Sequence, residues 1–459
     1  MTRTEMLMQD IRRRIISGAL PAGERLPSVR RYAAQMQVSP STVMEAYERL
    51  AATGIIVPRR GAGFFVTGSH QAPLNLVEKK ADYQRDVDPF WVSRQSLDAD
   101  PAVLKPGCGW LPADWMPVEA LRKAMRQLAR SDASLLSDYG STRGAVALRR
   151  LLLGRFAAEG LTTSLQNIML TGSGTQALDL ICRFLLRPGD TVLVDDPCYF
   201  NFQALLRAHQ VTMVGIPYTP SGPDVAAFEQ ALTLHRPRLY ITNSALHNPT
   251  GACLSAQTAW RLLAAARAHD LVIVEDDIFA EFEPDLSSRL AIPDGLERVI
   301  RMGSFSKTLS ASVRCGYIAC RAEWIEGLID LQIATSFGGP SPMTTELLAS
   351  VLSGGGYRKH LEEVTRRLAR ARKVAQDRLM ALGLTPWITP RGGFYLWCRL
   401  PAGMNSTTIA RRCREMNVVL APGNVFSVSQ TAGEFLRFNV AHLDDERVFS
   451  VLQQAMRAE

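Results

Sequence analysis

The chain has 459 residues, which exceeds the length of one ordinary domain and predicts two or three domains. Hydrophobic residues make up 47% of the sequence and charged residues 21%, a composition that excludes a disordered chain and allows a sizeable core. The net charge of +8 at pH 7 weakly favours a polyanionic partner.

The positive charge is concentrated near the N-terminus. Residues 1–70 hold ten Arg and no Lys against five Asp or Glu, so they supply +5 of the net +8. We therefore expect a small basic module on a nearly neutral body. The sequence shows neither an apolar signal core nor an apolar run of membrane length, which predicts a cytoplasmic protein. The eight Cys are scattered without a C-x-x-C pair and are interpreted as reduced core residues, so no metal site is expected.

The first 67 residues contain three predicted helices and a basic hairpin. Apolar residues recur with helical spacing in three segments, 7–15, 29–36 and 43–50. Ser39 is expected to cap the third helix, with Pro40 at its first position. The following IIVPRRGAGFFV indicates two short β runs around a Gly-rich turn. This order of elements is the plan of a winged helix.

In a winged helix the third helix enters the major groove of DNA, and the second helix and the wing approach phosphates. Hydroxyl and N–H groups at the start of the third helix are suited to phosphates or base edges. The candidate DNA contacts are Arg30, Ser39, Ser41, Thr42, Arg59 and Arg60. The pattern alone also fits a small structural or protein-binding module.

The segment LPSVRRYAAQMQVSPSTVMEAYERLAATGII closely resembles the GntR family of winged helices, and the resemblance covers nearly all of residues 1–67. It implies DNA contacts from the position of Arg30, from the start of the third helix and from the wing. Pro40 and Met44 stand where some members of that family have Arg. Base readout through these two positions is therefore not expected, whereas phosphate contacts are.

After the winged helix the composition and the hydrophobic pattern of the sequence change. Residues 68–88 are polar and lack clear periodicity, which predicts a linker with a candidate short strand at 74–77. Beyond it, apolar runs such as NIML, DTVLV, RLYIT and DLVIV alternate with helical patterns, which indicates βαβ units and a buried parallel sheet. From about residue 340, charged helical stretches and a few β runs predict a smaller α+β lobe. The predicted fold is a small α+β winged helix-turn-helix domain over 1–67 and a large α/β domain with this lobe over 89–459.

Five motifs in the second domain follow strands of the predicted sheet, at the edge where such sheets bind ligands. They are SGTQALDL, DDPCYF, HNPTG, VIVEDD and GSFSKTLSASVRCGY. Taken singly, most have ordinary explanations, such as a turn, a core tyrosine or a solvated lysine. Asp276 differs because it ends a buried strand, where an unpaired charge is costly, so a charged partner is expected.

Together these motifs supply the groups that a pyridoxal phosphate site needs. Lys307 offers an amine for a Schiff base, and Asp276 offers a carboxylate for a protonated ring nitrogen. Ser173, Gly174 and Thr175 would place N–H and hydroxyl donors at a helix N-terminus, which suits a phosphate.

Residues 89–459 resemble the fold-type I aminotransferases of the aspartate aminotransferase superfamily along almost their full length. The resemblance implies Lys307 as the Schiff-base lysine, Asp276 at the ring nitrogen, Asn248 at O3′ and Tyr199 on the ring face. The residues that it implies around the phosphate are Gly174, Thr175, Ser304, Ser306 and Arg314.

The same resemblance assigns two residues outside these motifs and exposes one departure. Arg437 in FLRFNVA matches the arginine that holds a substrate α-carboxylate as a bidentate pair. Tyr139 in SDYGSTRG matches a tyrosine that reaches the phosphate of the partner subunit, which implies a homodimer. Phe279 stands where many relatives have a tyrosine that donates a hydrogen bond to O3′. We therefore expect weaker catalysis.

The fusion of the two modules is typical of MocR-type transcription regulators. In that interpretation the second domain senses an amino acid or related amino compound, which forms an aldimine with the cofactor and repositions the winged helices on operator DNA. A working aminotransferase with an attached DNA-binding module is the first alternative, and a sensor of pyridoxal phosphate itself is the second. Arg437 favours an amino-acid-like ligand and therefore the first two interpretations.

Overall fold

The computed structural model describes residues 2–17, 19–59, 61–67, 89–98 and 100–457. The chain divides into two compact units, Met1–Gln84 and Arg85–Glu459. The linker expected over 68–88, with its candidate strand, lies outside the described residues, and so does Arg60.

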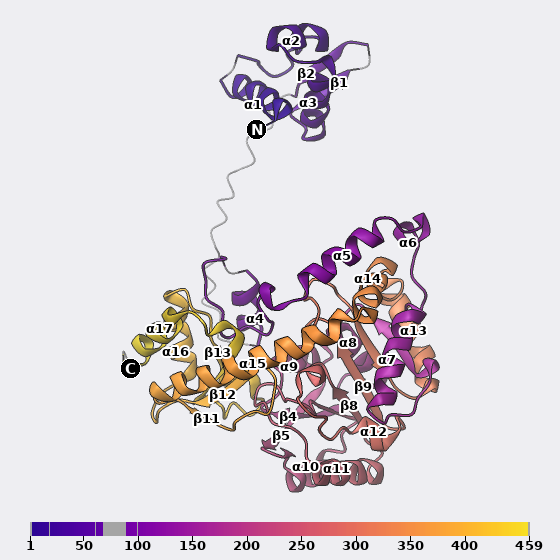
Figure 1. The fold of residues 1–459 in the computed structure, drawn as a ribbon, viewed down its shortest axis with the longest axis vertical. Helices are drawn as coiled ribbons and strands as arrows, with labels where there is room; N and C mark the ends of the chain where they lie inside the picture. Colours follow the sequence, from indigo (N-terminus) through magenta and orange to yellow (C-terminus); the bar gives the residue numbers. More distant parts are fainter. Residues whose placement is uncertain (1, 18, 60, 68–88, 99, 458–459) are drawn as a thin grey trace. The chain divides into compact units, whose positions relative to one another are not determined.

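The first unit has the predicted winged-helix plan (Figure 1). Its elements are α1 (Arg3–Ile16), α2 (Val29–Met36), α3 (Pro40–Ala52), β1 (Ile56–Arg59) and β2 (Gly63–Val66), and the two strands pair antiparallel. As expected from the sequence, the Ser39 side chain caps α3 and Pro40 occupies the first turn. Local cap chemistry therefore sets where the third helix begins.

The apolar faces of the three helices and the hairpin form one core. Its buried members include Leu7, Ile11, Val43, Ala46, Leu50, Ile56 and Val66. Two buried tyrosines tie the helices together, because the Tyr32 hydroxyl donates to Asp10 at 3.0 Å and the Tyr47 hydroxyl donates to the Pro27 carbonyl at 2.9 Å. This packing leaves the N-terminal end of α3 on the surface of the unit.

A sheet of eight strands forms the centre of the second unit, in the order β3-β10-β9-β8-β7-β4-β5-β6. The strands span Ile168–Thr171 (β3), Thr191–Asp196 (β4), Thr212–Thr219 (β5), Gly222–Pro223 (β6), Leu239–Thr242 (β7), Val272–Asp276 (β8), Val299–Ser304 (β9) and Gly316–Ala319 (β10). Strands β4, β5, β7, β8 and β9 are parallel, as predicted.

Two strands depart from the predicted parallel arrangement. β10 runs antiparallel to both of its neighbours, β9 and β3, and the short β6 runs antiparallel to β5. Only residues 305–315 connect β9 to β10, and a parallel crossover needs a dozen or more residues. The sheet is therefore mixed, and the short connection is the loop that carries Lys307.

Helices cover both faces of this sheet. One face packs against α7 (Val146–Ala158), α10 (Val225–His235), α11 (Ala256–Ala268) and α14 (Pro342–Ser353). The other face packs against α8 (Gly174–Leu185), α9 (Phe200–Ala208) and α13 (Ala322–Ser336). The remaining helices around the sheet are α5 (Val118–Leu128), α6 (Ala133–Ser137) and α12 (Ala291–Asp294). Because both faces are covered, the strands are mostly apolar, and most of their charged residues, such as Asp195, Glu275 and Asp276, lie near their carboxyl ends.

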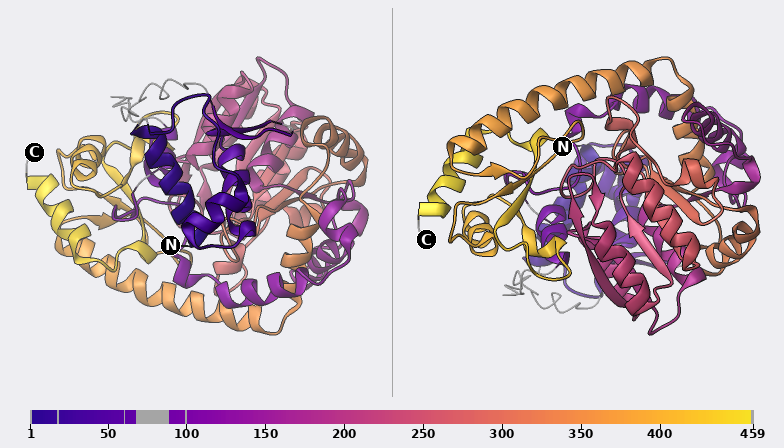
Figure 2. Two further views of the ribbon diagram at one scale, coloured as in Figure 1. Left: turned by 90° about the horizontal axis from the view of Figure 1, so that it is seen from above. Right: turned by 90° about the horizontal axis from the view of Figure 1, so that it is seen from below.

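The smaller α+β lobe is also confirmed. Its antiparallel sheet has the order β11-β12-β14-β13, with strands Thr385–Pro386, Tyr395–Arg399, Phe435–Asn439 and Ala421–Pro422 respectively. Its helices are α16 (Ser406–Glu415) and α17 (Glu446–Arg457), and the long α15 (Gly356–Ala381) runs from the large sheet into this lobe (Figure 2). α4 (Pro89–Leu97) precedes both sheets in the chain.

Short 3-10 helices occupy several connections of the second unit. They span Ala113–Trp115, Leu165–Asn167, Ala280–Phe282, Gly423–Phe426 and Val440–His442. No helix in the described ranges is both long and apolar enough to cross a membrane. The Cys residues are unpaired, and all except Cys253 are buried.

Candidate functional site

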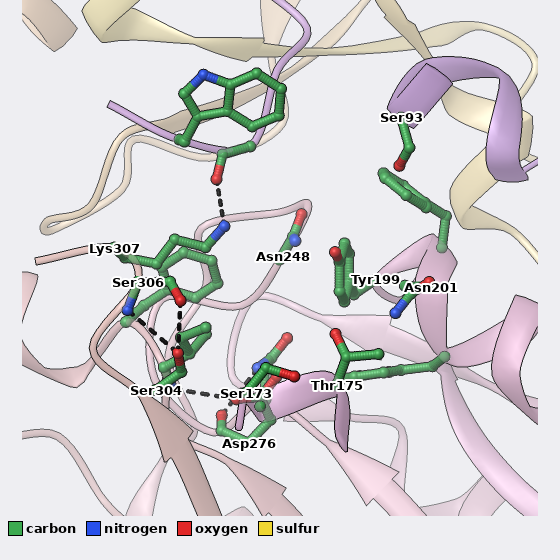
Figure 3. A pocket seen from close by; sticks show the side chains of 18 of the residues that line it. Ser93, Ser173, Thr175, Tyr199, Asn201, Asn248, Asp276, Ser304, Ser306 and Lys307 are labelled. Atoms are coloured by element: carbon green, nitrogen blue, oxygen red, sulfur yellow. Dashed lines mark hydrogen bonds between the residues drawn. The ribbon is translucent and has the colours of Figure 1, made fainter. Parts of the chain in front are cut away.

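A pocket lies at the carboxyl edge of the large sheet. It encloses about 940 Å³ of empty space, open mouth included, which is within the usual size of a small-molecule site. Its lining comes from the ends of β8 and β9, the first turns of α8 and α9, parts of β12, β14 and α4, and the loops that carry Gly109, Asn248 and Lys307. Figure 3 shows several of these side chains around the pocket. The five sequence motifs meet here because parallel strands place their carboxyl ends at one edge.

The predicted phosphate contacts come together in this pocket. They are Ser173, Gly174, Thr175, Ser304, Ser306 and Arg314. Ser173 caps α8 by accepting from the Gln176 N–H at 3.0 Å, and Thr175 is exposed in the first turn of the helix. The Ser304 and Ser306 hydroxyls lie 2.9 Å apart. A helix N-terminus, hydroxyls and an exposed guanidinium are suitable donors for a phosphate dianion.

Lys307 lies at the other end of the pocket, in the loop between β9 and β10. Its Nζ donates to the Gly109 carbonyl, and burial lowers the pKa of this amine to about 8. Two hydrogen bonds hold this loop in place. The Thr308 hydroxyl donates to the Glu281 carboxylate at 3.0 Å, and the Ser304 hydroxyl donates to the Cys315 carbonyl at 3.1 Å. A buried amine with a lowered pKa is more often neutral and therefore nucleophilic near neutral pH.

Asp276 ends β8 with its carboxylate facing the same pocket. Its side chain is 5% exposed and accepts from the Ile278 N–H at 3.1 Å. Burial raises the pKa of this carboxyl to about 7, although the Ile278 N–H and the charge of Lys307 act to lower it, and no ion pair to Asp276 is found within the described residues. The charged partner expected from the sequence is therefore not a side chain of this chain's described part, which leaves the carboxylate available to a ligand.

Arg437 connects the two lobes across the pocket. The side chain is 1% exposed, and its two Nη atoms donate to Asn248 Oδ1 at 2.8 Å and to the Gly107 carbonyl at 2.7 Å. The guanidinium lies over the rings of Tyr395 and Phe426 at 4.2 and 4.7 Å from their centroids. Its Nε has no hydrogen-bond partner among the residues that the structure describes.

Tyr199 and Phe279 line the pocket, whereas Tyr139 does not. Tyr199 precedes the first turn of α9 and packs against Phe202. Phe279 is 3% exposed, and its ring meets the Tyr395 ring edge-on with the centroids 5.5 Å apart, so Phe279 itself contributes no hydroxyl to the pocket. Tyr139 is 80% exposed and outside the pocket lining. The role implied for it in a partner subunit remains a prediction.

Several polar, small or aromatic lining residues were not identified from the sequence, among them Val92, Ser93, Ser96, Cys108, Gly109, Trp110, Asn201 and Tyr395. Six of these named residues belong to the stretch from α4 to residue 110, which carries no sequence motif, and they reach the pocket through tertiary packing. Tyr395 lies in a predicted β run, but an alternating pattern does not reveal which side chain meets a ligand.

The candidate DNA contacts of the first unit lie on its surface. Arg30, Ser39, Ser41 and Arg59 are exposed and Thr42 is partly exposed, while Arg60 is outside the described residues. The Ser39 hydroxyl lies 2.8 Å from that of Ser41 and 2.7 Å from that of Thr42, so three hydroxyls cluster at the start of α3. The Arg59 guanidinium rests 4.5 Å from the centroid of the Phe65 ring, which orients it on the wing.

The raised pKa of Asp276 predicts how the stability of the cofactor-free protein depends on pH. The folded carboxyl binds a proton up to about pH 7, whereas its ordinary value is 3.8. Its stabilising contribution is therefore present below about pH 4 and is lost as the pH rises through 7, with a total change of about 4 kcal/mol. Urea unfolding between pH 5 and 7.5 should show this loss in the wild type and a flatter profile in Asp276→Asn. Parallel profiles would mean that the carboxyl titrates normally.

Two family models match the chain. "Bacterial regulatory proteins, gntR family" matches residues 3–66, and "Aminotransferase class I and II" matches residues 111–454. Among curated proteins, the chain is 27% identical to the HTH-type transcriptional regulator YdcR of Escherichia coli, over 99% of this chain and 98% of the relative. It is 30% identical to the 2-aminoadipate transaminase of Thermus thermophilus, over 76% of this chain and 88% of the relative.

Solved structures similar to the second unit are aminotransferases as well. One similar structure is the α-aminoadipate aminotransferase LysN of Thermus thermophilus in complex with N-(5′-phosphopyridoxyl)-L-leucine. It is 27% identical to this chain with a TM-score of 0.71, and the match covers 80% of this chain and 94% of the LysN chain. The kynurenine aminotransferase of Pyrococcus horikoshii has a TM-score of 0.73 at 23% identity, covering 83% and 96%, and shares the fold. The chain thus belongs to the class I and II aminotransferases, whose cofactor is pyridoxal phosphate, and carries a GntR-family DNA-binding domain at its N-terminus, the combination of a MocR-type transcription regulator.

Proposed function

We propose that the chain is a pyridoxal-phosphate-dependent regulator that senses an amino acid or related amino compound through an aldimine. The DNA-binding domain spans residues 1–67, a linker spans 68–88, and the sensing domain spans 89–459. The observation that carries the proposal is the arrangement of Lys307, Asp276 and Arg437 around one pocket, on a chain that also has a DNA-binding domain.

The pocket fits the cofactor by its donor set. When bound, pyridoxal phosphate supplies an aldehyde that condenses with primary amines and a ring that withdraws electrons. Lys307 is the one lysine among the described lining residues, and Asp276 offers a buried, unpaired carboxylate for the ring nitrogen. Ser173, Gly174, Thr175, Ser304, Ser306 and Arg314 would hold the phosphate, Asn248 would hold O3′, and Tyr199 would cover the ring.

Arg437 supports a carboxylate-bearing ligand. It is a buried cation, and no ion pair within the described residues compensates it, because its Nη atoms bond only to neutral oxygens. A buried charge without a counterion is costly, and a ligand carboxylate would supply the missing anion as a charge-assisted pair. A sensor of pyridoxal phosphate alone would leave this arginine uncompensated.

The proposal includes a homodimer. Tyr139 lies outside the pocket of its own chain and is 80% exposed, with its ring packed edge-on against Phe337 at 4.9 Å. In the dimer its hydroxyl would reach the cofactor phosphate of the partner. Sedimentation of the purified full-length protein measures the oligomeric state directly.

A working aminotransferase remains the second candidate. The chain keeps both groups that catalysis needs at the reacting end, Lys307 and Asp276, and one relative is named as a transaminase. Absorbance titration of the holoprotein with single amino acids separates the two functions. A sensor stops at the ligand-bound spectrum, whereas an enzyme converts its cofactor to the pyridoxamine form and turns over with a keto acid.

Phe279→Tyr should raise the rate of any transamination half-reaction by about one to two decades, because it restores one hydrogen bond to O3′. Phe279 lines the pocket beside Tyr395, so the new hydroxyl would enter the site. Stopped-flow absorbance measures the rate, and DNA affinity measured in parallel should barely change. If the natural chain already turns over at about 10 per second, the sensor proposal fails and the enzyme takes its place.

A further inference from the structure

The carboxylate of Glu281 joins four segments of the second unit. Glu281 lies in the 3-10 helix Ala280–Phe282, which follows β8. It accepts hydrogen bonds from the Thr308 hydroxyl at 3.0 Å and from the Tyr357 hydroxyl, which lies 3.0 Å from each of its oxygens. Arg155 on α7 forms an ion pair with it at 2.8 Å. Since a carboxylate has about four acceptor sites, these donors occupy nearly all of them.

This cluster is largely buried but does not form part of the pocket lining. Thr308 is 2% exposed, and the side chain of Glu281 is 15% exposed. Burial and the charge of Glu281 raise the pKa of Tyr357 well above its ordinary value, so the tyrosine hydroxyl remains a donor near neutral pH. None of the four clustered side chains lines the pocket. They can act on the pocket through Lys307, the residue next to Thr308.

The sheet alone does not fix Lys307 relative to Asp276. The pairing of β8 with β9 ends at Asp276 and Met302, and Lys307 lies five residues beyond Met302, in the loop before β10. The hydrogen bond from Thr308 to Glu281 is a further tie, because it joins this loop to the turn that follows β8. The loop and the end of β8 are therefore held together beyond the last paired residues of the strands.

The shape of the cofactor makes this spacing important. The aldehyde carbon and the ring nitrogen of pyridoxal phosphate lie on opposite sides of one rigid aromatic ring. In the proposed function, Lys307 meets the first and Asp276 meets the second. A rigid ligand cannot adjust to a loop that drifts, so the amine must be held at a fixed separation from the carboxylate.

We infer that Glu281 is a positioning residue for Lys307, which it holds through Thr308 at the distance from the ring-nitrogen carboxylate that the rigid cofactor requires. Arg155 and Tyr357 hold the Glu281 carboxylate in place. Tyr357 lies in the first turn of α15, which runs into the smaller lobe, so the same cluster connects the lysine to the helix that joins the two lobes (Figure 2). The inference rests on the proposed function, in which Lys307 bonds to the cofactor.

The test compares two ligands of the full-length protein after its cofactor has been removed. The aldehyde of pyridoxal phosphate condenses with a lysine amine and releases water, whereas pyridoxamine phosphate carries an amine in place of the aldehyde and binds without this bond. The two compounds share the ring and the phosphate. The ratio of their affinities therefore reports the placement of Lys307. Quenching of tryptophan fluorescence measures both affinities, since Trp110 lines the pocket.

Thr308→Val is the first variant, because valine keeps the shape of the side chain and removes its hydroxyl. It should lower the affinity for pyridoxal phosphate about tenfold and leave the affinity for pyridoxamine phosphate unchanged. Thr308→Ser keeps a hydroxyl at this position and should keep the wild-type ratio. Glu281→Gln should lower the ratio as Thr308→Val does, and should also lower the melting temperature because it removes the ion pair with Arg155.

Glu283→Gln is the matched control. Glu283 follows Glu281 by two residues, its side chain is 3% exposed, and it forms an ion pair with Arg289 at 2.6 Å. Its other hydrogen bonds are with the Ser287 N–H and the Cys253 thiol, so it has no bond to the Lys307 loop. This variant should lower the melting temperature and keep the wild-type affinity ratio.

Two results would overturn the inference. They are an unchanged ratio in Thr308→Val and Glu281→Gln, and an equal loss of affinity for both compounds, because either would mean that the cluster serves stability alone. If Glu281→Gln does not fold, Thr308→Val decides. Borohydride treatment of the wild type tests the proposed function separately: if it fixes no pyridoxal phosphate to the protein, that function fails and the inference falls with it.

Discussion

Lys307→Ala should lose covalent cofactor completely. Borohydride reduction of the wild type is expected to fix pyridoxal phosphate to the protein and to abolish the visible band, whereas the variant should release all of its cofactor on denaturation. Imine formation needs a neutral amine, and the pKa of about 8 leaves about one tenth of Lys307 neutral at pH 7. No other lysine lines the pocket within the described ranges, so nothing replaces it.

Lys359→Ala is the matched control. Lys359 is an exposed residue on α15, outside the pocket, and its replacement should leave both the visible band and the fixed adduct unchanged. A fixed adduct that persists in Lys307→Ala would move the assignment to another amine. Peptide mapping of the reduced wild type would then identify that amine.

Much of the fold follows from local signals in the sequence. The strands β4, β7 and β8 are short apolar runs because helices cover them on both faces, and such runs can be recognised without a structure. Helix starts are equally local, since Ser39 and Ser173 cap the helices that follow them. The same caps place hydroxyl and N–H donors at the start of α3, where DNA phosphates are expected, and at the start of α8, where the cofactor phosphate is expected.

Strand direction does not follow from these signals. An apolar run has the same pattern in either direction, so the sequence predicted a parallel sheet, whereas the observed sheet is mixed because β10 runs antiparallel to both of its neighbours. The length of the connection is the useful evidence, because residues 305–315 are too few for a crossover. That short connection also carries Lys307, which lies at the carboxyl edge because β9 ends there.

The sequence assigned Arg437, Asn248 and Tyr139 to the site but did not predict which groups they contact, because these contacts join residues that are distant in sequence. Arg437 bonds to Asn248 and Gly107, and neither partner is near it in the chain. α4 reaches the pocket because Val92 packs against residues of α9 and of the smaller lobe. The position of Tyr139 relative to a cofactor depends on a second subunit, which no pattern within one chain encodes.

DNA binding by the first unit should depend strongly on salt. If Arg30, Arg59 and Arg60 each neutralise one phosphate, a dimer makes about six contacts, and the slope of log K against log salt is roughly −5. Arg30→Ala together with Arg59→Ala removes about four of them and should flatten the slope to roughly −2. Both side chains are exposed on the unit, so their replacement should leave its core intact. Fluorescence anisotropy with a duplex of random sequence, from 50 to 200 mM salt, measures the slope.

The control for this measurement is Arg122→Ala, which removes an exposed arginine of α5 in the second unit. Its slope should match that of the wild type. The reason is that phosphates are bound by particular arginines, those beside the third helix and on the wing, and not by the positive charge of the chain in general. If the double variant keeps the wild-type slope, the basic face lies elsewhere on the chain. If Arg122→Ala flattens the slope as much as the double variant does, the second unit shares the DNA contact, and binding is not confined to residues 1–67.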